Sequence, residues 1–285
     1  MNVEQKPKII LITGANKGLG FGILKLLAQK DSSKYTFIIG VRSIEKGEKA
    51  LEDLSKDAPG VQNRAKVKDL DITDAKSIDS FVKWIKETYG TIDCLVNNAG
   101  ISSNKEFGAE AVEETFATNV HGTIRLTEKL LPYISQKGKI VSIGSHVGTL
   151  ANLKSESLIN ELNAPEITVE KLKELIHRFE TAVKNGTSAE EGWVDSAYKA
   201  SKVFVNVYAQ ALSNLPEVTE KQIQCYSCTP GWVRTDIGGL KGERSIEEGA
   251  VCPAWLVQLP WEVIPGYQGK FFRDCQVVPL TKSSK

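Results

Sequence analysis

The sequence predicts a doubly wound α/β fold built on a mainly parallel, seven-stranded sheet. Short apolar runs alternate with longer amphipathic runs along most of the 285 residues, which is the pattern of consecutive βαβ units. Such units join parallel strands by right-handed crossovers, and helices then cover both faces of the sheet. The expected strands are residues 8–13, 35–41, 64–69, 92–97, 138–144, 222–228 and 269–273. The expected helices are residues 18–30, 44–57, 74–89, 109–117, 119–135, 196–214 and 245–258.

Composition and charge narrow the class of protein. The chain carries 36 Lys and Arg against 35 Asp and Glu without a long run of one sign, so we expect neither a nucleic-acid partner nor an acidic membrane surface. No stretch approaches the roughly 20 apolar residues of a membrane span. The first eight residues lack an apolar signal core and the cysteine count is odd, which favours reduced thiols and a cytoplasmic location. We expect one domain over residues 1–285.

Cys225 and Cys228 have the spacing of a C-x-x-C motif but lie in an expected strand. Side chains at positions i and i+3 of a strand point to opposite faces. This geometry argues against a shared metal or a redox pair, and no metal site is expected.

A glycine-spaced turn follows the first strand directly. Residues 8–20 read KIILITGANKGLG, so Gly14, Gly18 and Gly20 lie between an apolar strand and a helical pattern. Glycine lets the backbone approach a pyrophosphate closely, and the helix N-terminus offers unpaired N–H groups and a positive dipole end. The turn therefore predicts a dinucleotide site.

The end of the second strand indicates which dinucleotide binds. A site for NAD places Asp or Glu there, whereas this strand ends in Val41 and Arg42. A guanidinium suits a 2′-phosphate, and Lys17 in the glycine turn adds a second cation. The two residues predict NADP, although both would also be ordinary as solvated surface charges.

Two polar segments follow the third and fourth strands. Residues 97–100 read NNAG after the strand DCLV, at the carboxyl edge of the sheet where ligands of α/β proteins bind. The same residues would also make a plain Asx turn. Asp71 has two readings as well, as the N-cap of the next helix or as a ligand of a purine amino group.

Tyr198 and Lys202 form the strongest candidate pair for chemistry. They lie four residues apart on an expected helix, so both side chains share one face. An ammonium beside a phenol lowers the phenol pKa from about 10, which suits proton transfer near neutral pH. Ser145 ends the fifth strand, where its hydroxyl would donate to a substrate carbonyl. Asn119 opens an expected helix as a cap or a kink.

Residues 150–192 interrupt the strand–helix alternation and contain a helix of their own. Thr168 is placed as its N-cap and Gly186 as its stop. Its apolar stripe consists of Leu172, Leu175, Ile176, Phe179 and Val183. We expect a helical insertion whose apolar face packs on the main domain.

Together these residues resemble the short-chain dehydrogenase/reductase family over nearly the whole chain, and the resemblance implies a Rossmann-type fold. The motifs stand in family order. They are residues 13–20, Asp71, residues 97–100, Asn119, Ser145, Tyr198 to Lys202, and Pro230-Gly231. The sequence is most similar to the monomeric, NADPH-dependent carbonyl reductases in residues 191–193 and 229–235 and in the insertion, which separates Ser145 from Tyr198 by 53 positions.

The resemblance implies a role for each matching residue. Tyr198 would give a proton to the carbonyl oxygen, Lys202 would bind the nicotinamide ribose and lower the tyrosine pKa, Ser145 would polarise the carbonyl, and Asn119 would hold a water. The implied cofactor-binding residues are Gly14, Asn16, Lys17, Gly18, Leu19, Gly20, Arg42, Asp71, Ile72, Asn97, Ala99, Gly100, Tyr198, Lys202, Pro230, Val233 and Thr235. The implied substrate-binding residues are Ser145, His146 and Trp232. Within these sets, Asp71 and Ile72 would face the adenine, and Val233 and Thr235 would close over the nicotinamide.

The residues on either side of Ser145 are a glycine and a histidine. Gly144 departs from the family pattern, in which many members have a second serine before the catalytic one. His146 is placed to touch substrate, but a partly exposed loop histidine is an equally good reading. Trp193 is expected to serve packing rather than substrate binding.

The resemblance implies NADPH-dependent reduction of ketones or aldehydes to alcohols by a monomer with a small-molecule substrate. Two alternatives stay open: a non-catalytic NADP-binding regulatory protein, and an alcohol dehydrogenase that works in the oxidative direction. The complete set of Asn119, Ser145, Tyr198 and Lys202 favours an enzyme.

Overall fold

A computed structural model describes residues 6–30, 34–264 and 266–281. Parts of the expected domain 1–285, and most of the first eight residues, which were searched for a signal peptide, therefore lie outside the described residues. The described strands form one sheet in the order β3-β2-β1-β4-β5-β6-β7-β8. Their bounds are β1 Lys8–Thr13, β2 Tyr35–Val41, β3 Ala65–Asp69, β4 Ile92–Asn97, β5 Ile134–Ile143, β6 Gln224–Thr229, β7 Phe271–Arg273 and β8 Gln276–Val277. Every pairing is parallel except that of β7 with β8, which confirms the doubly wound, Rossmann-type prediction.

The prediction of seven strands misses β8, a strand of two residues. Asp274 and Cys275 turn the chain back with φ angles of 51° and 62°. Two left-handed residues in a row make the tight hairpin turn that usually carries Asn-Gly or Asp-Gly. Because Asp-Cys is not such a signal, the sequence did not reveal the hairpin.

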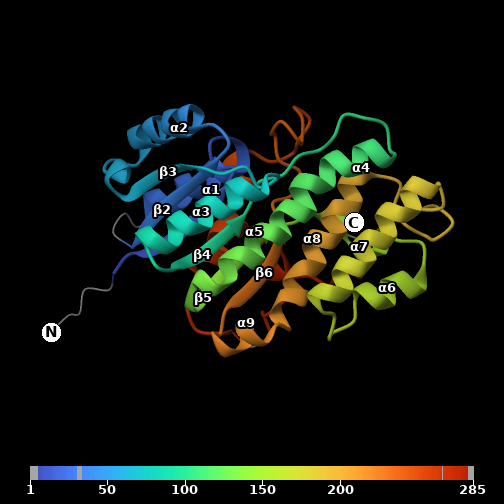
Figure 1. Ribbon diagram of the computed structural model, residues 1–285. Coiled ribbons are helices and arrows are strands. Elements are labelled where there is room, and N and C mark those ends of the chain that lie inside the picture. The colour runs from blue at the N-terminus through green and yellow to red at the C-terminus, as the bar shows by residue number, and fades with distance from the viewer. Residues whose placement is uncertain (1–5, 31–33, 265, 282–285) are drawn as a thin grey trace.

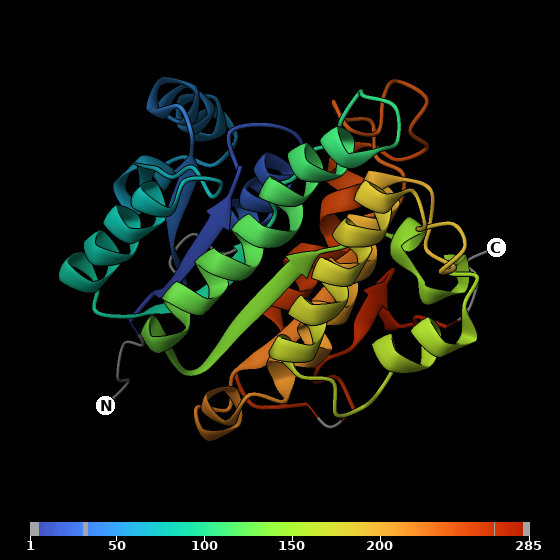
Figure 2. The same ribbon diagram turned by 45° about the vertical axis from the view of Figure 1, so that its right-hand side comes forward.

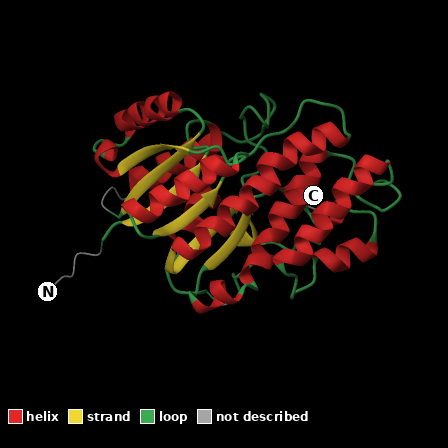
Figure 3. Cartoon of the chain, viewed as in Figure 1, coloured by secondary structure: helices red, strands yellow, loops and turns green. Residues whose placement is uncertain are grey.

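Helices cover both faces of the sheet, and Figures 1 and 3 show this layering. The described helices are α1 Gly18–Lys30, α2 Ile44–Asp57, α3 Ala75–Thr88, α4 Ala109–Phe116, α5 Thr123–Leu130, α6 Glu156–Leu162, α7 Val169–Asn185, α8 Ala197–Ser213, α9 Pro216–Glu220 and α10 Ile246–Gln258. Residues of α1, α2 and α10 share one hydrophobic cluster, and residues of α3, α4, α5 and α8 share the other. Cys228 belongs to the first cluster and Cys225 to the second, as their strand spacing predicted.

The expected helix 119–135 is wrong at both ends. Residues 117–122 form a π-helical turn that joins α4 to α5, and α5 ends at Leu130. Pro132 lies in a 3-10 turn that follows, and β5 begins at Ile134, four residues before the predicted strand. Proline has no backbone N–H and therefore cannot make the next i→i−4 hydrogen bond of an α-helix, which explains the early end.

The insertion consists of α6 and α7 rather than one helix. Thr168 accepts a hydrogen bond from the Lys171 amide at 3.1 Å, and Gly186 ends α7 with a φ of 75°, so both predicted signals are confirmed. The apolar face of α7 packs against α4 and α8, and Figure 2 shows α7 beside α8. Short α6, like α9, gave too little periodic pattern to be recognised.

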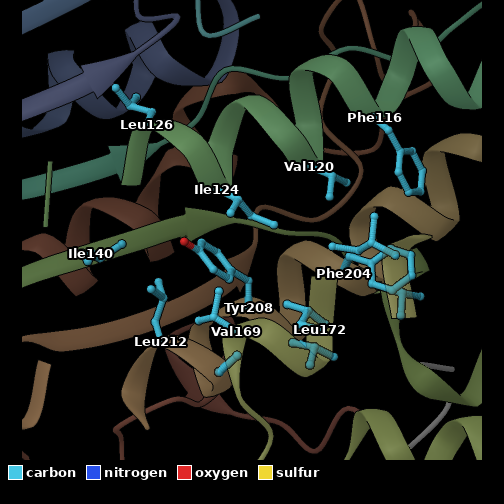
Figure 4. Packing of buried hydrophobic residues seen from close by; sticks show 14 of the residues in the cluster. Phe116, Val120, Ile124, Leu126, Ile140, Val169, Leu172, Phe204, Tyr208 and Leu212 are labelled. Atoms are coloured by element: carbon cyan, nitrogen blue, oxygen red, sulfur yellow. The ribbon is translucent and has the colours of Figure 1, made fainter. Parts of the chain in front are cut away.

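An aromatic cluster carries much of this packing. The ring of Phe179 stacks on Phe116 at 5.3 Å and meets the edge of Trp193 at 5.3 Å. In Figure 4, Phe204 lies between Phe116 of α4 and Leu172 of α7. Trp193 is 2% exposed, which confirms its predicted role in packing.

No helix within the described ranges is long and apolar enough to cross a membrane. Within the same ranges, no group of His, Cys, Asp or Glu is placed to hold a metal ion, and all five cysteines are free thiols.

Candidate functional site

The glycine turn lies beside the loop after β4, at the point where the strand order reverses between β1 and β4. Gly14 and Gly18 have φ angles of 66° and 55°, which L-residues rarely adopt. The Asn98 side chain donates to the carbonyl of Thr13 at 2.7 Å, and the Thr13 hydroxyl accepts from the Ala99 amide at 2.9 Å. A Cβ atom on Gly20 would collide with the Asn98 amide. The two loops therefore hold each other in one conformation.

Asn98, not Asn97, makes these contacts. The Asn97 side chain points into the core, where its amide donates to Thr127 Oγ1 at 2.9 Å. Asn97 is 5% exposed, and its backbone lies at the carboxyl end of β4. The motif itself contains two asparagines, and nothing in the sequence distinguished them.

The two predicted cations lie at the surface on either side of the glycine turn. Arg42 is exposed directly after β2 and has no ion-pair partner among the residues that the structure describes. Lys17 forms an ion pair with Asp236, which lies in the loop after β6. Both partners of that pair are largely exposed, so the pair contributes little to stability.

Asp71 and Ile72 follow β3. Asp71 accepts from the amide of Thr73 at 2.8 Å and from its hydroxyl at 2.7 Å, which is an Asx turn. The N-cap of α3 is Asp74, so the reading of Asp71 as a helix cap is wrong. Ile72 is buried in the hydrophobic cluster beneath the loop.

Asn119 lies inside the π-helical turn that interrupts the α4–α5 helix. Such turns are frequent at functional sites because they re-aim a side chain. The Asn119 oxygen accepts from the Ile101 amide at 2.8 Å, and its nitrogen donates to Ser201 Oγ at 3.0 Å. The predicted kink is confirmed, and it ties the long helix to α8.

Ser145 and Tyr198 are brought together from positions far apart in the chain. Ser145 lies just beyond β5, and its hydroxyl accepts from the Val147 amide at 3.3 Å. The Ser145 side chain lies beside the phenol of Tyr198. Burial raises the pKa of Tyr198 to about 12, and the Ser145 side chain acts in the opposite direction. The expected net lowering of this pKa is therefore wrong for the protein as described, because desolvation of the phenol outweighs the opposing effect of Ser145.

Lys202 is buried on the same face of α8 as Tyr198. Its Nζ donates to the carbonyl of Ile143 at 2.8 Å and lies 5.6 Å from the centre of the Tyr198 ring. A Cβ atom on Gly100 would lie 3.8 Å from this nitrogen, so the loop after β4 borders the same space. Burial lowers the pKa of Lys202 to about 8.

The loop after β6 closes the other side of the site. Thr235 approaches the glycine turn, because a Cβ atom on Gly18 would lie 3.7 Å from its methyl group. The Val233 side chain packs against Gly249 of α10 and is 5% exposed. Trp232 is half-exposed, and its indole donates to the carbonyl of Gly238 at 2.8 Å. Pro230 accepts a hydrogen bond from the Arg244 guanidinium at 3.4 Å.

Arg244 is a residue that sequence reasoning missed. Its backbone pairs with Trp232, and its guanidinium forms an ion pair with Asp274 at 2.6 Å. These contacts tie the loop to the β7–β8 hairpin. A single arginine 13 residues after Gly231 carries no local signal that would have revealed them.

His146 is partly buried beside Ser145. Burial lowers its pKa, and the positive charges of Arg273 and Arg244 act in the same direction. The imidazole is therefore neutral at neutral pH, which leaves it able to donate or accept a hydrogen bond at the edge of the site.

Comparison with known proteins identifies the family. A family model described as short chain dehydrogenase matches residues 8–156, more than half of the chain. The chain belongs to the short-chain dehydrogenase family. Carbonyl reductase (NADPH) 1 of Mus musculus is 37% identical to this short-chain dehydrogenase over 279 residues, which cover 95% of this chain and 98% of the mouse protein.

Solved structures extend the likeness beyond residue 156, into the part that contains Tyr198 and the insertion. Salutaridine reductase from Papaver somniferum superposes with a TM-score of 0.80 at 26% identity, over 94% of this short-chain dehydrogenase and 100% of the plant chain. Menthone neomenthol reductase from Mentha piperita gives 0.78 at 26% identity, over 94% and 99%.

Proposed function

We propose that this short-chain dehydrogenase reduces ketones or aldehydes to alcohols with NADPH. The observation that carries the proposal is the meeting of Ser145, Tyr198 and Lys202 at the carboxyl edge of the sheet, beside the glycine turn. The names of the relatives support it, because the mouse protein is a carbonyl reductase that uses NADPH and two similar structures are reductases.

The residues present fit an NADP cofactor. The left-handed glycines Gly14 and Gly18 bring bare backbone to the start of α1, where a pyrophosphate would meet unpaired N–H groups. Arg42 offers an exposed guanidinium to a 2′-phosphate. Lys17 would exchange Asp236 for the same phosphate, since their ion pair is exposed.

The side chains of the site divide the remaining chemistry. A bound, reduced nicotinamide would supply the hydride. The Ser145 hydroxyl would donate to the substrate oxygen and hold it against Tyr198, whose phenol is protonated at neutral pH and would deliver its proton to that oxygen. The Lys202 ammonium uses one donor on Ile143 and keeps two for the ribose and for the negative charge left on the phenol.

A substrate panel with the purified protein tests the function. We expect carbonyl-dependent oxidation of NADPH, which Tyr198→Phe abolishes while NADPH binding is retained. Tyr133→Phe is the matched control, because it removes a phenol far from the site. Binding of NADPH without turnover across the panel would instead support the regulatory alternative, and turnover confined to alcohols with NADP+ would support the oxidative direction.

The cofactor preference has its own test. Arg42→Asp should weaken NADPH use and favour NADH, because a carboxylate repels a 2′-phosphate and binds a 2′-hydroxyl. An unchanged ratio of kcat/KM for the two cofactors would reject the role of Arg42.

We also propose a single-domain monomer of the cytoplasm. The insertion helix α7 covers apolar faces of α4 and α8 that would otherwise be available to a second copy. The free thiols fit a reducing compartment. Light scattering at micromolar concentration should give the mass of one chain, and a dimer would contradict the proposal.

A further inference from the structure

Asn206 is a buried amide on the helix that carries Tyr198 and Lys202. The three residues follow one another at intervals of four, so they lie along one face of α8. Asn206 is completely buried, and an amide in that position needs partners for its two N–H groups and its oxygen.

Each of those partners is a backbone group of the loop that carries Ser145. The Asn206 oxygen accepts from the Ser145 amide at 3.2 Å. Its nitrogen donates to the carbonyl of Ser145 at 2.8 Å and to that of Gly148 at 2.9 Å. One side chain thus holds both backbone groups of the serine and the end of the turn that follows.

Two glycines make this contact possible. A Cβ atom on Gly144 would overlap the Asn206 oxygen, and one on Gly148 would overlap the backbone of Lys202. The Gly144 amide also donates to the carbonyl of Cys228 at 2.8 Å, which fixes the loop from β6. The glycine at the position where many family members have serine is therefore explained by Asn206, since the amide occupies the space of a side chain.

We propose that Asn206 is a positioning residue, which with Gly144 sets the Ser145 hydroxyl in line with the Tyr198 phenol. The proposal rests on the proposed reductase function. Ser145 comes from a loop and Tyr198 from α8, and the hydrogen bonds of Asn206 couple the two elements directly beside the reacting groups. A shift of about 1 Å in such a group can cost about 100-fold in rate.

The first test compares Asn206→Ala with Gln210→Ala. Gln210 lies one turn further along α8 and donates to the carbonyl of Pro165 at 3.0 Å, so its loss also removes an amide–carbonyl bond but leaves the serine loop intact. We expect Asn206→Ala to lower kcat by about 100-fold with little change in the Kd of NADPH, and Gln210→Ala to keep kcat within about twofold. An unchanged kcat in Asn206→Ala would overturn the proposal.

The second test uses Gly144. Gly144→Ser should lower kcat strongly in the native background because its Cβ collides with Asn206. In the Asn206→Ala background the collision is gone, so the same change should cost little, and the two changes should be far from additive. Full activity of Gly144→Ser alone, or additive losses, would contradict the packing argument.

Two further readouts separate positioning from folding and from the failure of the function itself. Asn206→Ala should move the pH dependence of alcohol oxidation with NADP+ to higher pH, because a loosened Ser145 no longer lowers the tyrosine pKa. Hydrogen exchange of residues 143–149 should rise in Asn206→Ala and not in Gln210→Ala. If the native protein has no activity, the proposed function fails, while exchange still shows whether Asn206 holds the loop; unchanged exchange would overturn that part.

Discussion

Two buried lysines with the same pKa lie in different regions of the molecule. Burial lowers the pKa of Lys202, at the carboxyl edge of the sheet, and that of Lys139, in the middle of β5, to about 8 each. Lys139 donates to the carbonyl of Val257 in the last turn of α10 and to that of Leu259 just after it, and it lies 4.0 Å from the Trp261 ring. Lys202 donates to one carbonyl and faces the space beside Tyr198.

The difference teaches that burial and a shifted pKa do not by themselves mark a functional residue. The Lys139 ammonium donates to carbonyls at the C-terminal end of α10, where a cation satisfies free carbonyls and complements the helix dipole. The Lys202 ammonium donates to one carbonyl among the described residues, and it lies at the carboxyl edge of the sheet, where ligands of α/β proteins bind. We therefore expect the two residues to separate stability from activity.

The largest expected effect is on turnover. Lys202→Met should lower kcat about 1000-fold, because the site loses the charge that supports proton transfer by Tyr198. Lys139→Met should keep kcat within about twofold. Steady-state NADPH oxidation measures both, and equal losses in the two variants would erase the distinction.

The pH dependence of kcat/KM should report Lys202 alone. The lowered pKa predicts a loss of activity as pH rises through about 8, when the free enzyme loses the ammonium. Lys202→Arg should move this alkaline limb to higher pH, and Lys139→Met should leave it in place. An alkaline limb that moves in Lys139→Met but stays in place in Lys202→Arg would contradict its assignment to Lys202.

Stability should respond in the opposite order. Lys139→Met leaves the carbonyls of Val257 and Leu259 without a donor, which costs about 1–3 kcal/mol in the free energy of unfolding. Lys202→Met frees only the carbonyl of Ile143 and removes a buried charge, so it should cost less or stabilise. Denaturant unfolding of the variants measures the comparison, and a less stable Lys202→Met would speak against it.

The smallest effect is on the pH dependence of stability. Both lysines have a lower pKa in the folded than in the unfolded protein, so between pH 8 and 10.5 the unfolded chain binds more protons and stability rises with pH. The rise begins below pH 8, and from pH 7 to pH 8 each lysine should contribute only about 0.4 kcal/mol to the free energy of unfolding. Lys139→Met should flatten the curve by this amount, measured as the urea midpoint at the two pH values, and a steeper curve would show that the sign is wrong.

Sequence reasoning predicted the features that depend on near neighbours along the chain. The glycine turn at Gly14 and Gly18 and the caps Thr168 and Gly186 rest on local backbone requirements. The shared face of Tyr198 and Lys202 follows from helical spacing alone. Each of these features was found where the sequence placed it.

The features that the sequence did not reveal depend on partners in other segments of the chain. The Asn97 side chain contacts Thr127, the Val233 side chain packs on Gly249 of α10, and Arg244 pairs with Asp274. The raised pKa of Tyr198 is a second kind of miss, because desolvation depends on how deeply the folded chain buries the phenol.

The sequence by itself determined the order of the longer strands and helices, the family, the glycine turn and the shared helix face of Tyr198 and Lys202, because periodicity and motif spacing are properties of the unfolded chain as much as of the folded one. Only the tertiary structure decided which side chains share an environment. It placed Asn206 against the loop of Ser145. It also directed the Lys139 ammonium to two carbonyls at the end of α10 and the Lys202 ammonium to the space beside Tyr198. Burial and hydrogen-bond partners arise when distant segments pack, so no local pattern could have distinguished two lysines with the same lowered pKa.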